Sequence, residues 1–264
     1  MRVALIALLM LCLLLTLACE STRMPVGSQP AEGRRSAAPL DAGWPLVILW
    51  AWQRPEDLSF IDPQRVGVSY LVKTIQLKGQ SVFVQPNMNG LKVPAGTWVM
   101  ACARIETDAG SPPSLSPQQT HETASALASL AEFPDARAVQ IDFDATASQR
   151  DFYRDLLVEL RRRLPRQIPL SITALGSWCV GDRWIAHLPI DEAVPMLFRM
   201  GPDRASILLR LQDGEDFEEP LCRQSVGIST DELVPHLPGR RRLYIFNPNN
   251  WTKATFNKVV TIKD

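Results

Sequence analysis

The sequence predicts an α/β fold, a small or degenerate (β/α)8 barrel, for residues 44–264. First, short apolar runs of strand length recur along this part of the chain. Second, amphipathic helical segments separate several of these runs, as in a parallel sheet covered by helices. Third, the G-x-G-x-x-G turn of a dinucleotide-binding open sheet and the P-loop are both missing from the sequence. The barrel is therefore favoured over its competitor, an open doubly wound sheet.

The predicted strands are continuous apolar runs, which indicate strands that are covered on both faces. The first is W-P-L-V-I-L-W-A-W, directly after a polar segment. The full set comprises residues 44–52, 67–71, 97–105, 138–144, 169–175, 193–200, 225–228 and 242–247.

Two helices and one hairpin are predicted between these strands. Ser116, Pro117 and Gln119 have the form of a capping box with proline at the first helical position, which predicts a helix to about residue 130. Ser148 is expected to cap the next helix, which Pro165 ends. Residues 74–86 instead alternate with period two around K-G-Q, which predicts a β-hairpin insertion between the second and third strands.

The first 43 residues carry targeting signals rather than a fold. Residues 1–18 are almost wholly apolar after Arg2, which favours a signal peptide, and T-L-A-C at 16–19 resembles a bacterial lipobox with Cys19 as the lipidated residue. An ordinary signal peptide or a lone membrane anchor is the alternative. Residues 19–43 are too poor in large apolar side chains to form a core and predict a flexible tether. We expect an exported protein of the bacterial cell envelope, anchored by lipid to the outer membrane or the periplasmic face.

The charge balance and the cysteines indicate which ligands and cross-links are expected. The 28 basic and 28 acidic residues balance, so there is no basic surplus for binding nucleic acid. In an oxidising compartment Cys179 and Cys222, both in predicted loops, are candidates for a disulfide, whereas Cys102 lies in an apolar run and is expected to be a buried thiol. These three Cys and the three His residues (His121, His187 and His236) are scattered without ligand spacing, so no metal is predicted. No organic cofactor is predicted either.

The candidate site is the end of the barrel where the strands finish, because their carboxyl ends converge there. Asp142 and Asp144 are two residues apart on a predicted strand and therefore share a face. Such carboxylates are typical of glycosidases, and Glu106 on the preceding strand is a third candidate. The alternative is a buried ion-pair network without a catalytic task.

Further polar and aromatic side chains near the strand ends are predicted to bind substrate. Tryptophan rings among them would suit stacking on sugar rings, although a single tryptophan is commonly part of the core. These residues are Trp50, Trp52, Arg54, Arg104, Thr173, Trp178, Asp182, Met196, Arg199, Tyr244 and Asn247.

Several segments resemble a known family. A-V-Q-I-D-F-D-A-T-A-S-Q-R-D-F-Y, I-P-L-S-I-T-A-L-G-S-W-C and D-E-A-V-P-M-L-F-R-M-G look like an uncharacterised family of bacterial exported proteins, a domain of unknown function. Its members resemble glycoside-hydrolase TIM barrels, which implies a TIM-like barrel that acts on carbohydrate. The fourth strand also resembles the chitinase-like pattern D-x-x-D-x-D-x-E, but Val139 and Thr146 replace its first and last acidic positions.

Two hypotheses of function follow from the sequence. The first is a glycosidase that acts on a polysaccharide or glycan, with Asp144 as general acid and Glu106 as base or nucleophile. The second is a non-catalytic envelope lipoprotein whose degenerate barrel binds a glycan or a protein. The sequence predicts neither the sugar nor the oligomeric state.

Overall fold

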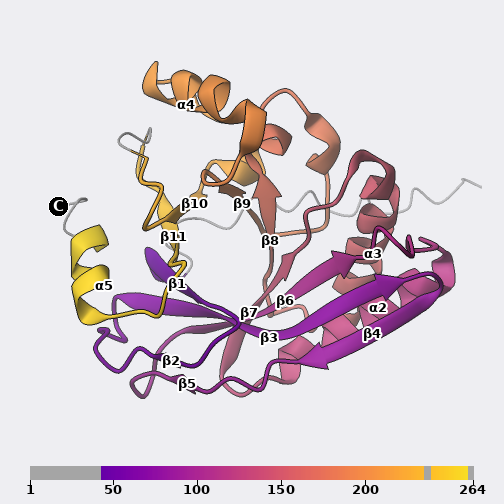
Figure 1. Cartoon of the computed structure of the whole chain (residues 1–264), viewed down its shortest axis with the longest axis horizontal. Helices are drawn as coiled ribbons and strands as arrows, with labels where there is room; N and C mark the ends of the chain where they lie inside the picture. Colours follow the sequence, from indigo (N-terminus) through magenta and orange to yellow (C-terminus); the bar gives the residue numbers. More distant parts are fainter. Residues whose placement is uncertain (1–42, 235–238, 261–264) are drawn as a thin grey trace, which may run out of the picture. The chain divides into compact units, whose positions relative to one another are not determined.

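The computed structural model describes residues 43–234 and 239–260, and its centre is a closed barrel of parallel strands (Figure 1). Each strand pairs with its neighbours in chain order, and the first strand pairs with both the second and the last, which closes the barrel. The strands are β1 (Val47–Ala51), β3 (Val66–Lys78), β6 (Val99–Thr107), β7 (Ala136–Asp142), β8 (Leu170–Leu175), β9 (Glu192–Met196), β10 (Ser225–Ser229) and β11 (Arg242–Phe246). The predicted TIM-like barrel is confirmed, and the pairing of β1 with β11 excludes the open sheet.

The connection from β3 to β6 is built from strands. β3 runs on past the barrel to Lys78, turns at Gly79 and pairs antiparallel with β4 (Ser81–Pro86). Gly79 has a φ of 53°, a left-handed conformation that glycine adopts without steric cost. A second short pair, β2 (Glu56–Asp57) with β5 (Leu91–Lys92), lies beside this region. The strand that pairs with β4 is thus the extension of the barrel strand β3 and not a separate strand.

In the part of the chain that the structure describes, α-helices follow only some of the barrel strands, which is why the barrel is degenerate. They are α2 (Pro117–Ala128) after β6, α3 (Arg150–Arg163) after β7, α4 (Arg204–Gln212) after β9 and α5 (Lys253–Val260) after β11. Between β8 and β9 the chain forms only the short 3-10 helices η3 (Gly176–Cys179) and η4 (Arg183–Ile185).

The predicted N-terminal cap is confirmed for α2 and wrong for α3. Ser116 is the N-cap of α2 and its hydroxyl accepts from the Gln119 backbone N–H, as predicted. Before α3, however, the capping box is formed by Thr146 and Gln149, not by Ser148. The short 3-10 helix η2 (Ala147–Gln149) precedes α3, so the cap lies two residues earlier than predicted.

The barrel interior contains a compact polar layer among apolar side chains. The amide of Gln140, on β7, accepts from Trp50 Nε1 at 2.8 Å and from Ser69 Oγ at 2.9 Å, and it donates to Ser171 Oγ at 3.2 Å. These contacts satisfy the buried polar atoms that an all-apolar interior would leave unpaired. The apolar neighbours in the interior include Ile48, Met100 and Tyr244.

Trp50 fills the middle of the barrel because β10 has no side chain at the facing position. A Cβ added to Gly227 would lie 2.7 Å from Cη2 of the Trp50 indole, closer than real Cβ atoms approach other heavy atoms. The indole also packs against the ring of Tyr244, with centroids 5.3 Å apart. Glycine at position 227 therefore makes room for the Trp50 ring.

A buried ion pair lies where β9 and β11 begin. The Arg242 guanidinium is paired with the Glu192 carboxylate, and both side chains are only 2% exposed. Glu192 also accepts from Tyr244 Oη at 2.6 Å and from Ser171 Oγ at 3.1 Å. Arg242 donates to the Pro45 carbonyl and lies over the Trp44 ring, with 4.7 Å between its guanidinium carbon and the ring centroid. Each carboxylate oxygen of Glu192 therefore has a donor.

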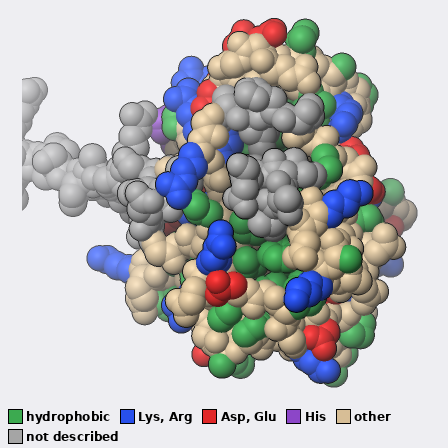
Figure 2. All heavy atoms as spheres, turned by 90° about the vertical axis from the view of Figure 1, so that its left-hand side faces the viewer, with side chains coloured by type: hydrophobic (Ala, Val, Ile, Leu, Met, Phe, Trp, Pro, Cys, Tyr) green, Lys and Arg blue, Asp and Glu red, His purple; other side chains and the backbone are tan. Residues whose placement is uncertain are grey.

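A disulfide joins two connections in the second half of the chain. Cys179, in η3, is bonded to Cys222, in the 3-10 helix η6 (Pro220–Cys222), and Cys102 is a buried free thiol. Within the described ranges, no helix is both long and apolar enough to cross a membrane. The predicted signal peptide, Cys19 and the tether up to residue 42 lie outside the described residues. On the face seen in Figure 2, basic and acidic side chains are interspersed around a central group of hydrophobic ones.

Candidate functional site

A cavity of about 320 Å³ opens where the barrel strands end. Its walls come from the carboxyl ends of β1, β6, β7, β8, β9 and β11 and from the segment that leads into α4. This is the end of the barrel at which the sites of such folds are found. The cavity is lined by Trp50, Trp52, Arg104, Asp142, Asp144, Thr173, Leu175, Gly176, Ser177, Met196, Phe198, Arg199, Met200, Asp203, Ile207 and Phe246.

Asp142 is held in place on the last residue of β7. Its carboxylate accepts from Arg104 Nη1 at 2.8 Å and from Thr173 Oγ1 at 2.7 Å. The side chain is only 5% exposed, so these charge-assisted bonds replace the water that a buried carboxylate loses. Asp142 therefore forms a buried ion pair with Arg104, of the kind that the sequence analysis gave as the alternative to a catalytic role.

Asp144 lies just beyond the strand and is much freer. Its side chain is 50% exposed, and the nearest cation is Arg104, with Nη2 4.0 Å from Oδ2. Desolvation by the surrounding protein, and next the charge of Asp142, raise the pKa of the Asp144 carboxyl above its ordinary value, against the opposing effect of Arg104. The protonated form of Asp144 is therefore favoured relative to an ordinary aspartate.

Glu106 does not line the cavity. Its carboxylate accepts from Arg104 Nε at 2.9 Å, whereas Asp142 accepts from Nη1 of the same guanidinium. The structure thus brings Asp142, Asp144 and Glu106 together around one arginine, but only the two aspartates face the cavity.

Aromatic rings form one wall of the cavity. Phe198 and Phe246 stack with an interplanar angle of 2° and centroids 5.6 Å apart. The Arg199 guanidinium lies over both rings, with its carbon 5.8 Å and 5.5 Å from their centroids. Arg199 has a φ of 53° and its guanidinium is paired with Asp231 at 3.2 Å, which fixes it against the wall. Trp52 adds a partly buried ring to the cavity.

Several residues predicted to bind substrate are placed elsewhere. Trp178 is 2% exposed and packs edge-on against Trp184 in the outer core, because the chain folds back in η3 after β8. Asp182 is paired with Arg150, at the start of α3. Tyr244 lies deep in the barrel with its hydroxyl on Glu192. None of these three lines the cavity.

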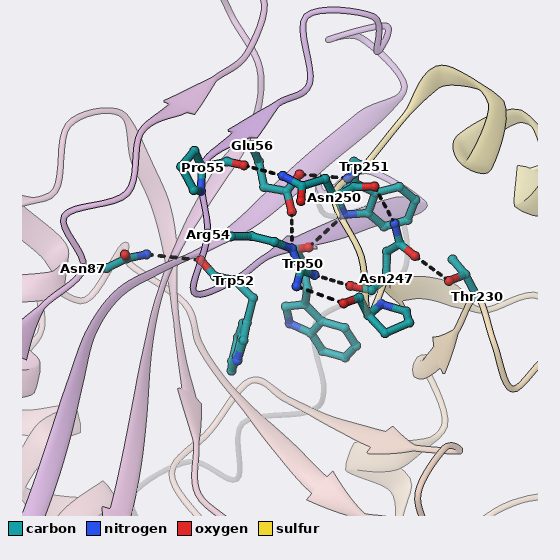
Figure 3. A network of polar contacts seen from close by, with 11 residues as sticks. Trp50, Trp52, Arg54, Pro55, Glu56, Asn87, Thr230, Asn247, Asn250 and Trp251 are labelled. Carbon is teal, nitrogen blue, oxygen red and sulfur yellow. Dashed lines mark hydrogen bonds and ion pairs between the residues drawn. The ribbon is translucent and has the colours of Figure 1, made fainter.

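Arg54 and Asn247 belong to a structural network at the end of β1 (Figure 3). Arg54 donates to the carbonyls of Asn247 and Pro248 and pairs with the buried Glu56 at 2.9 Å. Glu56 in turn accepts from the backbone N–H of Trp251 at 2.9 Å. The network ties the β1 end to the loop after β11, so these side chains hold the barrel rim and do not face the cavity.

Other lining residues were not predicted. Phe246, at the end of the eighth predicted strand, was placed at the barrel mouth but left out of the predicted binding residues. Phe198 is two residues beyond Met196, so continuing the period of two past the end of β9 could have found it. Met200, Asp203 and Ile207 come from the segment between β9 and α4 and from α4 itself. The path of that segment over the barrel end has no signature in the sequence.

The described residues contain no group of three or more His, Cys, Asp or Glu side chains arranged to hold a metal ion. The polar groups of the cavity are instead carboxylates, guanidinium groups and hydroxyls, as is typical of a site for a polar organic ligand.

No protein-family model matches the sequence, and no curated protein matches it. The resemblance to an exported family therefore stays a prediction. Among solved structures, similarity is found to the chitinase domain of the spore coat protein CotE from Clostridium difficile. The identity is 15% and the TM-score 0.41, over 61% of this chain and 52% of that chain, so the match spans about half of that domain's chain. A TM-score this low assigns nothing, and the barrel rests on the strand pairing described above.

Proposed function

We propose that the protein binds a glycan in the cavity at the barrel mouth and hydrolyses it, with Asp144 as the general acid. The observation that carries the proposal is the contrast between two neighbouring carboxyls. Asp142 is buried and ion-paired with Arg104, whereas Asp144 is half-exposed in the cavity and has a raised pKa. Glycosidases use such a contrast, because the carboxyl that keeps its proton can protonate the leaving oxygen.

The walls support a sugar ligand. Trp52 and the stacked Phe198 and Phe246 offer flat apolar surfaces for the C–H faces of sugar rings. Thr173 and Ser177 bring hydroxyl groups to the same cavity, where they can exchange hydrogen bonds with sugar hydroxyls. Export to the bacterial envelope and a lipid anchor at Cys19 are part of this proposal.

Hydrolysis can be tested by incubating the purified protein with a panel of polysaccharides and measuring new reducing ends. Asp144→Asn is expected to lower the rate by at least about a hundredfold, since it removes the proton donor. Because the pKa of Asp144 is raised, the wild-type rate is expected to fall on the alkaline side at a higher pH than for an ordinary aspartic acid. Asp213→Asn, an exposed residue just after α4, is the matched control and should leave the rate unchanged. Equal rates in the wild type and in Asp144→Asn would contradict the assignment.

Glycan binding and stability are expected to depend on different residues that follow β1, Trp52 in the cavity and Arg54 in the network at the barrel rim. Arg54→Ala should lower the free energy of unfolding by about 2 kcal/mol, because Glu56 loses a charged partner, and should leave glycan affinity unchanged. Trp52→Ala should weaken glycan binding about tenfold and change stability less. Urea denaturation and calorimetric titration measure the two effects. A glycan affinity that depends on Arg54 and not on Trp52 would mean that the ligand lies elsewhere.

A second candidate function is glycan binding without hydrolysis. It is favoured by the two positions at which the sequence analysis places a second catalytic carboxylate, because neither offers one to the cavity. Thr146 caps the helical segment before α3, and Glu106 lies outside the cavity lining. Saturable binding of a glycan without any release of reducing ends would establish this function.

A further inference from the structure

Carboxylates outnumber guanidinium groups around the cavity. Each arginine there already has an acidic partner: Arg104 pairs with Asp142 and Glu106, Arg199 with Asp231 at 3.2 Å, and Arg204 with Glu232 at 3.0 Å. Asp144 is left out of the charge balance because its protonated form is favoured. Among the described residues, the other acidic side chains of the cavity and of these ion pairs are Glu106, Asp142, Asp203, Asp231 and Glu232, five against the three arginines. The surplus is therefore negative, and an approaching cation is attracted.

Asp203 is the lining carboxylate that the protein leaves without a partner. Among residues 43–234 and 239–260, its carboxylate takes part in no ion pair or side-chain hydrogen bond. Although it immediately precedes α4, it makes no capping hydrogen bond to that helix. Its neighbours in the lining, Met200 and Ile207, are apolar. Asp203 is exposed, so its carboxylate is accessible to a ligand in the cavity.

The aromatic wall is also suited to cations. The Arg199 guanidinium already lies over the faces of Phe198 and Phe246, which shows that these ring faces accept a positive group at cation–π distance. A sugar that combines an apolar ring face with a positive charge would match both the rings and Asp203. A sugar acid would instead meet the surplus of carboxylates.

We propose that the ligand of the cavity is a glycan with free amino groups, and that an ammonium group of the sugar pairs with Asp203. This inference rests on the proposed glycan site and names its substrate class, the unacetylated amino sugars. Asp144 keeps its separate role beside the glycosidic oxygen, because its protonated form is the one that acts there.

The test compares β-1,4-linked hexamers of glucosamine, of N-acetylglucosamine and of glucose, which differ only at C2 of each ring. Affinities are measured by calorimetric titration in slightly acidic buffer, at about 0.02 M and about 0.2 M salt. All variants carry Asp144→Asn, so that the oligomers are not consumed. We expect the glucosamine hexamer to bind at least about tenfold more tightly than the glucose hexamer, with a preference that shrinks at the higher salt.

Asp203→Asn should remove most of this preference, whereas Asp213→Asn, near the other end of α4, should retain it. Thermal unfolding of each variant verifies that it is folded. Equal or tighter binding of the glucose or acetylated hexamer, or a preference that survives Asp203→Asn, would overturn the amino-sugar inference and leave the glycan site intact. If none of the three hexamers binds, the amino-sugar inference is wrong, and the proposed glycan site is then decided separately by the polysaccharide panel described above.

Discussion

Arg242→Met is expected to lower the free energy of unfolding by about 3–5 kcal/mol, because it leaves the Glu192 carboxylate buried without its cation. Glu192 would still accept from Tyr244 and Ser171, but two neutral hydroxyls do not compensate a full charge. Burial, and next the charge of Glu192, raise the pKa of Tyr244 well above its ordinary value, so this hydroxyl keeps its proton and remains a donor. Urea denaturation at neutral pH measures the loss.

The double variant Arg242→Met with Glu192→Gln is the control for this prediction. It removes both charges while the introduced glutamine side chain keeps the shape of the glutamate, so it should recover much of the lost stability. A loss below about 1 kcal/mol in Arg242→Met alone would contradict the prediction, since it would mean that the Glu192 charge does not need its partner.

Removal of the disulfide by the double change Cys179→Ala and Cys222→Ala is expected to cost about 4 kcal/mol of stability. The bond closes a loop with a sequence separation of 43. Without this cross-link the unfolded chain regains the conformational entropy that the loop had removed, which favours unfolding. The bond also joins the connection after β8 to the one before β10, so its loss should loosen these two connections relative to each other. Denaturant unfolding under oxidising conditions measures the difference.

Reduction provides an independent comparison. A thiol reductant should shift the unfolding midpoint of the wild type toward that of the double alanine variant, and it should leave the variant itself unchanged. Cys102 stays a free buried thiol in both proteins and therefore cancels in the comparison. If the reductant leaves the unfolding midpoint of the wild type unchanged, the cross-link adds no stability.

The strands of the barrel could be predicted because burial on both faces makes them continuous apolar runs. Residues 44–52 and 242–247 illustrate this, since both correspond to strands of the closed sheet. The predicted cap of α3 lies two residues late, because Thr146 and Ser148 are chemically equivalent caps and only the chain geometry selects one. The closure of β1 on β11 also depends on tertiary pairing, which a single sequence does not reveal.

Most of the site could be predicted at the strand ends and in the few residues directly after them, but not further along the loops. Asp142, Thr173 and Met196 sit on inner strand positions, and period two places them at the cavity. Trp178 and Asp182 follow β8 in the sequence, but the chain folds back there and takes both side chains away from the cavity. Asp203 was not predicted, because nothing in its local sequence shows that the segment before α4 reaches the barrel mouth.

The absence of a side chain at position 227 constrains how this barrel can change over evolutionary time. Because an added Cβ would lie 2.7 Å from the Trp50 ring, substitutions at the two positions are coupled, and their order matters. A smaller residue at position 50 must come first, and only then can position 227 gain a side chain without overpacking. A lineage that takes this path exchanges one large aromatic ring below the ligand cavity for two smaller side chains, and so can alter the depth of the cavity without moving a strand.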